Sequence, residues 1–137
     1  MKIVLDTNVL VAGLLSPFGP CGEIVRMVSS GKVTLCFDAA ILTEYREVLH
    51  RRKFGFDKDR VAALLGHIEH RGHMVASSPL RYSLPDPDDE PFLKVAVAGK
   101  AVSLVTGNAA HFPAKRCQGR RVLSPSEFLT FYKKQQK

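Results

Sequence analysis

Hydrophobic residues in this 137-residue chain form short runs that alternate with longer segments of helical periodicity. The short runs predict strands at residues 3–5, 33–37, 74–76, 102–105 and 122–123. Apolar positions three and four residues apart predict helices at residues 23–30, 39–53, 57–70 and 91–100, followed by a final helix from Ser124. Residues 9–15 are apolar and suit either a helix or a turn. This alternation predicts an α/β fold, with a mostly parallel sheet of four to five strands between helices.

Capping residues support several of these boundaries. Asp38 suits the N-cap of the helix that follows it, and Gly72 suits the end of another. The segment Ser124-Pro125-Ser126-Glu127 has the form of a capping box, with proline at the first helical position.

Length and composition then narrow the class of protein. The length suits a single domain, which we expect over residues 1–132, with a polar, basic tail at 133–137. No apolar run approaches the roughly 18 residues that span a bilayer, so we expect a cytoplasmic protein without a membrane partner. The three cysteines include no CxxC pair, which argues against a disulfide framework or a structural zinc site.

The charge is unbalanced in a way that suggests a partner. Twenty Lys and Arg residues oppose thirteen Asp and Glu residues, which gives a formal charge of +7. A basic excess is typical of proteins that bind nucleic acid, although it also occurs in proteins that do not. Four of the thirteen acids nevertheless fall within residues 86–90.

Polar residues follow the predicted strands at the edge where parallel α/β sheets bind their ligands. Asp6 follows the first strand, Asp38 the second, and Thr106-Gly107-Asn108 the fourth. Asp6 also suits the N-cap of a helix that starts nearby, and the two roles are compatible. The segment from Thr106 to Asn108, taken alone, also suits a plain turn.

Glu44 lies at the border of the apolar stripe of its predicted helix, whereas Glu47 lies on the solvent side. A carboxylate at the border of a buried face needs a partner, because an unpaired buried charge is costly. That partner is either an Arg or Lys side chain, or a metal ion in a cleft.

The acidic cluster contains Asp86, Asp88, Asp89 and Glu90. One of these acids suits the N-cap of the helix that follows, but a cap accounts for only one of them. A solvated acidic loop is one alternative. The other is a divalent cation, which would relieve the repulsion and bind the same oxygens.

Together, these positions predict one oxygen-lined site. Carboxylate and amide oxygens suit Mg²⁺ or Mn²⁺, and such ions can stabilise both the attacking and the leaving oxygen of a phosphodiester. The basic surface would then bind the flanking phosphates.

The sequence resembles the PIN-domain nucleases of the VapC-like toxin type over nearly its whole length. The resemblance rests on residues 4–9, on Glu44, on Asp86-Pro87-Asp88-Asp89, and on residues 104–108 before His111-Phe112-Pro113. It implies a PIN-like three-layer sandwich and a Mg²⁺- or Mn²⁺-dependent endoribonuclease that hydrolyses single-stranded RNA. It also implies a toxin with a cognate antitoxin, and a homodimer.

The resemblance also implies the roles of individual residues. Asp6, Glu44 and Asp89 would be the acidic metal ligands, with Asp86 and Asp88 left open as further ligands. Asn108 stands where many relatives carry an acid, and it would orient a second ion or its waters. Thr7, Asn8 and Thr106 would support the site.

Three other interpretations compete with that of a nuclease. A haloacid-dehalogenase phosphatase needs a second acid two residues after Asp6, where this chain has Asn8. A receiver domain needs paired acids near the first strand. A catalytically weak or inactive PIN-fold module that binds RNA or protein also remains an alternative, with Asn108 as its support.

His111 is interpreted as part of a structural turn.

Overall fold

The computed structural model describes residues 1–136, and its centre is a five-stranded parallel sheet in the order β3-β2-β1-β4-β5. The strands are β1 (Lys2–Leu5), β2 (Thr34–Phe37), β3 (His73–Met74), β4 (Ser103–Val105) and β5 (Val122–Leu123). The fully buried residues Ile3, Val4 and Leu5 make β1 the centre of the core. The predicted fold class, a parallel sheet of four to five strands flanked by helices, is confirmed.

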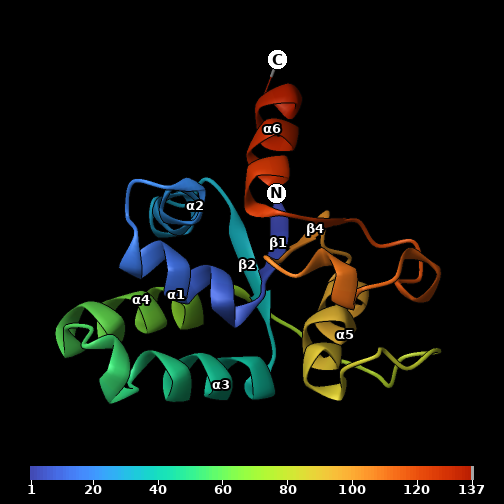
Figure 1. Ribbon diagram of the computed structural model, residues 1–137, viewed down its shortest axis with the longest axis horizontal. Helices are drawn as coiled ribbons and strands as arrows, with labels where there is room; N and C mark the ends of the chain where they lie inside the picture. The colour runs from blue at the N-terminus through green and yellow to red at the C-terminus, as the bar shows by residue number, and fades with distance from the viewer. Residues whose placement is uncertain (137) are drawn as a thin grey trace.

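Within residues 1–136, six α-helices and four short 3₁₀ turns surround the sheet (Figure 1). The helices are α1 (Thr7–Leu15), α2 (Pro20–Ser29), α3 (Ala39–Leu49), α4 (Lys58–Arg71), α5 (Glu90–Ala98) and α6 (Pro125–Gln135). The 3₁₀ turns are η1 (Arg52–Phe54), η2 (Pro87–Asp89), η3 (Ala109–His111) and η4 (Ala114–Arg116).

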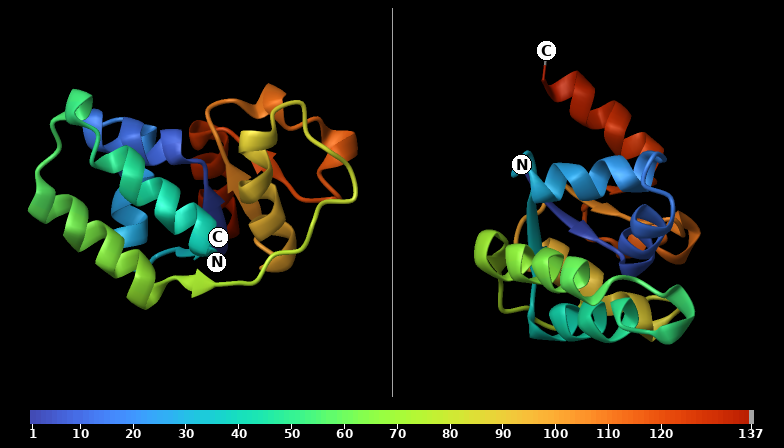
Figure 2. Two further views of the ribbon diagram at one scale, coloured as in Figure 1. Left: turned by 90° about the horizontal axis from the view of Figure 1, so that it is seen from below. Right: turned by 90° about the vertical axis from the view of Figure 1, so that its left-hand side faces the viewer.

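The helices pack on both sides of the sheet (Figure 2). Helix α5 packs along β1, β2 and β4, whereas α6 packs against β4 and β5. Helix α2 contacts both α6 and α4, and α1 contacts α2 and α3. Because all five strands are parallel, the segments that follow β1 and β4 leave the sheet at the same edge.

Several caps match the predicted boundaries. The Asp38 carboxylate accepts the Ile41 N–H at 2.8 Å, and α4 ends with Gly72 as its C-cap. Ser124 and Glu127 form the predicted capping box at the start of α6. The segment 9–15, which suited a helix or a turn, lies in a helix that begins at Thr7.

Other predicted boundaries are wrong. The helix predicted over 39–53 ends at Leu49, because the next positions of its buried stripe are taken by exposed Arg52 and Lys53. The chain instead makes the turn η1, which closes at Gly55 in the left-handed region with φ 61°. The third strand is His73–Met74 rather than 74–76, paired with the end of β2.

The C-terminal end of the chain is more helical than the predicted tail suggests. Helix α6 continues to Gln135, so most of the tail predicted at 133–137 is helical, while residue 137 lies outside the described residues. Within residues 1–136, no single helix is long and apolar enough to cross a membrane. Helices α1 and α2 reach the required composition only together, with a bend of 103° between them.

A candidate acidic active site

Asp6 lies at the carboxyl end of β1 and is only 6% exposed. Its backbone N–H donates to the Val105 carbonyl at 3.0 Å, which holds it beside the end of β4. The Thr106 hydroxyl donates to the Asp6 carboxylate at 2.8 Å, and the Asn8 N–H lies 3.4 Å from it. Asp6 is therefore the N-cap of α1 as well as a buried carboxylate at the ligand-binding edge of the sheet.

Glu44 reaches the same region from α3. The Thr7 hydroxyl donates a hydrogen bond to the Glu44 carboxylate. The next residue, Tyr45, is fully buried and donates its hydroxyl to the Leu5 carbonyl at 2.5 Å, which fixes α3 against the end of β1. Glu44 is half-buried and Glu47 is exposed, as the periodicity predicts.

The carboxylates of the acidic loop have different roles. Asp86 accepts the Asp88 N–H at 2.9 Å and so caps η2. Glu90 accepts the Leu84 N–H at 3.0 Å. Asp89 is N-cap of α5 by position but makes no side-chain capping bond, so its carboxylate is free to face the site.

Asp89 is electrostatically coupled to the other acids. Partial burial, followed by the charges of Asp6 and Asp86, raises the pKa of Asp89 above its ordinary value. His111 opposes this shift, because its Nδ1 lies 3.2 Å from the Asp89 carboxylate. Two segments that are distant in sequence, the end of β1 and the acidic loop, thus bring like charges together.

A cavity of about 280 Å³ joins these groups. Its lining consists of Asp6, Thr7, Asn8, Glu44, Val48, Arg51, Lys53, Phe54, Asp88, Asp89 and Phe92. Two of the predicted metal ligands, Asp86 and Asn108, are exposed and do not line it. Thr106 is fully buried and acts through Asp6, while the Asn108 backbone N–H donates to the Thr106 hydroxyl at 3.0 Å.

The donor chemistry of this cavity fits a hard divalent cation. All its potential ligands are oxygens, and no Lys or Arg of the described residues lies within ion-pair distance of Asp6, Glu44, Asp88 or Asp89. In residues 1–136, however, no three acidic, His or Cys side chains form a ready-made metal-binding group. The residues fit the ion by donor type and charge, and their present arrangement does not itself form a complete ligand set.

Sequence reasoning missed the basic and aromatic part of the cavity. Arg51, Lys53 and Phe54 line it because α3 stops early and η1 turns back across its end. Lys53 Nζ lies 5.1 Å from the centre of the Phe54 ring, which itself stacks on Phe56. The run Arg51-Arg52-Lys53 could have indicated a basic patch near the acids. In the continuous helix that was predicted, however, these three side chains would point in different directions around the helix axis.

His111 was interpreted as part of a turn, and it does lie in η3. Its contact with Asp89 joins residues 22 positions apart, which no local pattern indicates. Asp38, also at the carboxyl edge of the sheet, is occupied by capping α3 and by the Ser77 hydroxyl, which donates to it at 3.2 Å.

Comparison with known proteins agrees with this architecture. The sequence matches the PIN domain family over residues 2–110. It is 26% identical to the uncharacterized protein MJ1680 of Methanocaldococcus jannaschii, over 79% of this chain and 71% of that protein.

The fold is also similar to a chain in the crystal structure of VapBC2 from Rickettsia felis bound to a DNA fragment from their promoter. The TM-score is 0.58 and the sequence identity 17%, over 90% of this chain and 98% of that chain. This likeness shows a shared fold. Since the family match covers most of the sequence and the fold agrees with it, the chain belongs to the PIN domain family, whose members are generally nucleases.

Proposed function

We propose that this protein is a Mg²⁺- or Mn²⁺-dependent endoribonuclease that hydrolyses phosphodiester bonds of single-stranded RNA. The observation that carries the proposal is the convergence of Asp6, Glu44, Asp88 and Asp89 on one cavity, where no Lys or Arg within residues 1–136 is paired to any of them. Carboxylates gathered in this way repel one another unless a cation lies between them. A phosphodiester is itself negatively charged, so it also needs a cation in order to bind in an acidic pocket.

Asp6, Glu44 and Asp89 are the residues proposed to hold the metal ion. When bound, the ion supplies positive charge that activates water and offsets the charge developing on the phosphate. Thr106 and Thr7 orient the Asp6 and Glu44 carboxylates through the hydrogen bonds described above. His111 orients the Asp89 carboxylate through its ring Nδ1, which lies 3.2 Å away.

Arg51 and Lys53 give the cavity a cationic side next to its acidic groups. Arg51 lies 3.7 Å from Glu47 in an exposed pair, which is weak enough to exchange for another anion. These two cations are placed to contact phosphates that flank the cleaved bond. The acids and the cations therefore match different parts of one polyanionic substrate.

Metal-dependent cleavage is the direct test of this proposal. Purified protein is incubated with single-stranded RNA and Mn²⁺ or Mg²⁺, with and without EDTA, beside Asp6→Asn. We expect cleavage to depend on the metal and to fall at least ~100-fold in the variant, since even residues that only support metal ligands change activity 10–100-fold. Asp59→Asn, at an exposed position of α4, is the control. Equal cleavage by Asp6→Asn would overturn the assigned site.

A binding readout separates loss of metal from loss of chemistry. Millimolar Mn²⁺ should raise the melting temperature of the wild-type protein through preferential binding to the folded state, and should raise that of Asp6→Asn less. A melting temperature that does not respond to Mn²⁺, combined with RNA binding but no cleavage, would instead support the inactive binding module.

We further propose that the nuclease is the toxin of a toxin–antitoxin pair, acts in the cytoplasm and forms a homodimer. The VapBC2 neighbour supports the first part of this proposal, because its fold matches almost end to end. Expression of the wild-type protein should arrest growth, and Asp6→Asn should not. Sedimentation at several concentrations tests the dimer.

A further inference from the structure

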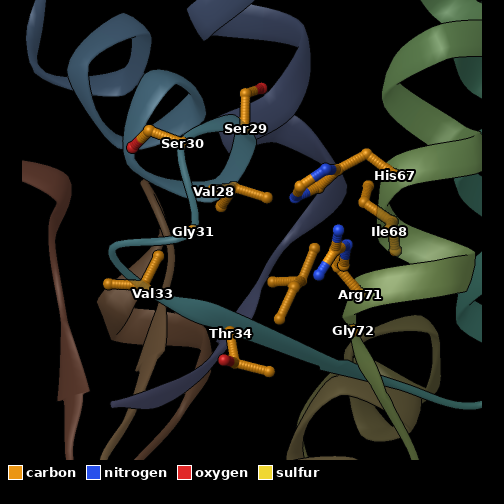
Figure 3. A pocket seen from close by; sticks show the side chains of 11 residues that line it. Val28, Ser29, Ser30, Gly31, Val33, Thr34, His67, Ile68, Arg71 and Gly72 are labelled. Atoms are coloured by element: carbon orange, nitrogen blue, oxygen red, sulfur yellow. The ribbon is translucent and has the colours of Figure 1, made fainter.

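A second, larger cavity lies at the opposite end of the sheet from the acidic site. It has a volume of about 550 Å³ and is formed by the end of α2, the start of β2 and the last turns of α4 (Figure 3). Thr34, the first residue of β2, lines it, whereas Asp6 follows the last residue of the neighbouring parallel strand β1. The two cavities share no lining residue.

The charge of this second cavity is opposite to that of the acidic site. His67 and Arg71, one turn apart on α4, point from the helix into the cavity toward the end of α2 (Figure 3). The lining contains no acidic residue, and neither side chain has a hydrogen-bond or ion-pair partner among the described residues. The Arg71 guanidinium therefore has no counter-charge among the described residues, and the His67 ring lies one helical turn before it.

The backbone around the cavity does not supply acceptors for these two side chains either. Helix ends expose carbonyl groups with partial negative charge, and both α2 and α4 end here. The Met27 and Val28 carbonyls, however, already accept N–H groups from residues 31–33, and the Ile68 carbonyl accepts from Gly72 at 2.8 Å. These carbonyl acceptors are therefore already satisfied without Arg71 or His67.

The rest of the lining is apolar at its floor and polar at its rim. Val28, Val33, Leu35 and Ile68 are buried, His67 is half-buried, and Arg71, Ser29 and Ser30 are exposed. A small ligand in this cavity would thus meet cationic donors on one side and apolar surface beneath. Volumes of about 300–1,000 Å³ are typical of small-molecule sites.

We infer that this cavity binds a small phosphate ester, with the phosphate on Arg71 and His67 and the organic group on the apolar floor. Arg matches the geometry of phosphate oxygens with two parallel N–H donors, and a His ring donates one N–H even when neutral. This site is separate from the proposed nuclease site and does not depend on its activity.

Binding is tested with the full chain in EDTA, so that no metal-dependent phosphate binding occurs at the acidic cavity. Adenosine monophosphate and inorganic phosphate are titrated separately, followed by the NMR signals of the His67 ring and by calorimetry. Adenosine monophosphate should bind, and Arg71→Ala and Arg71→Gln should each weaken it by about tenfold or more. Two matched variants should bind normally: Arg60→Ala, exposed on the same helix but outside this cavity, and Asp6→Asn.

The outcomes are distinct. No perturbation of His67 by either probe, or unchanged affinity in both Arg71 variants, would overturn the inference. Binding of adenosine monophosphate that is tighter than that of phosphate would support both the cationic contact and the apolar floor. Equal binding of the two would overturn the role of the floor. Because Asp6→Asn retains this site, failure of RNA cleavage and failure of phosphate binding are separately detectable.

Discussion

The two halves of the acidic site are built differently. Asp6 and Glu44 are each held by a threonine hydroxyl, on elements that are fixed by the buried contact between Tyr45 and Leu5. Asp88 and Asp89 instead lie on the turn η2, where Asp88 is exposed and Asp89 is half-buried, and the described contact to the rest of the site is Asp89 with His111. The first half is ordered by the core, whereas the second half is ordered by local turn geometry. Substitutions in the first half should therefore cost more.

After Asp6→Asn, the largest effect is expected from Glu44→Gln. Loss of one carboxylate charge from the cavity should lower the RNA cleavage rate by about 100-fold, whereas Glu69→Gln, an exposed change on α4, should leave it unchanged. Initial rates at saturating Mn²⁺ provide the measurement. Similar rates in the two variants would show that Glu44 is not part of the site.

Thr106→Val should have the next largest effect, because it removes the hydroxyl that donates to Asp6 while keeping the shape of the side chain. Supporting residues of this kind typically contribute 10–100-fold, so we expect a loss of cleavage in that range together with weaker Mn²⁺ binding. Thr130→Val, at an exposed position of α6, is the matched control. Unaltered Mn²⁺ affinity in Thr106→Val would contradict the proposed positioning role.

Asn108→Ala tests a predicted metal ligand that lies outside both halves of the acidic site. The side chain is exposed and lies outside the cavity, and the backbone N–H that contacts Thr106 survives the substitution. Cleavage should therefore fall less than about tenfold, below the range of the supporting residues. A loss as large as that of Asp6→Asn would return Asn108 to the ligand role that the family resemblance implies.

The smallest effect concerns stability rather than rate. Burial and neighbouring acids raise the pKa of Asp89, so its ionisation disfavours the folded state of the metal-free protein as the pH rises through that pKa. Asp89→Asn should thus raise the melting temperature slightly at pH 7 in EDTA, with the difference vanishing below about pH 3, where the carboxyl is protonated in both states. Glu69→Gln, an exposed change on α4, controls for net charge. A lower melting temperature of Asp89→Asn at pH 7 would contradict this assignment.

Much of this molecule could be predicted from its sequence, because its strands are short apolar runs bounded by polar residues. The same logic placed Asp6 at the carboxyl edge of the sheet and Glu44 at the border of a buried face. The end of α3 was missed because Arg51 to Lys53 are good helix formers, although the apolar stripe of the helix stops at Leu49. As a result, the cationic side of the cavity was missed.

The acidic loop shows a second limit. Adjacent carboxylates have the same local propensities, and only the folded turn decides that Asp86 caps η2 while Asp89 faces Asp6. The contact between Asp89 and His111 depends on how η2 and η3 lie in space. Sequence pattern therefore predicted the position of the acids better than their individual roles.

The outer strands of the sheet have a consequence for self-association. Both β3 and β5 contain only two residues, so each border of the sheet offers few unpaired backbone donors and acceptors to another chain. Edge-to-edge pairing of strands between two copies of the chain is therefore unfavourable. Oligomers of this protein should accordingly assemble through helix surfaces, which leaves the strand register of each copy intact.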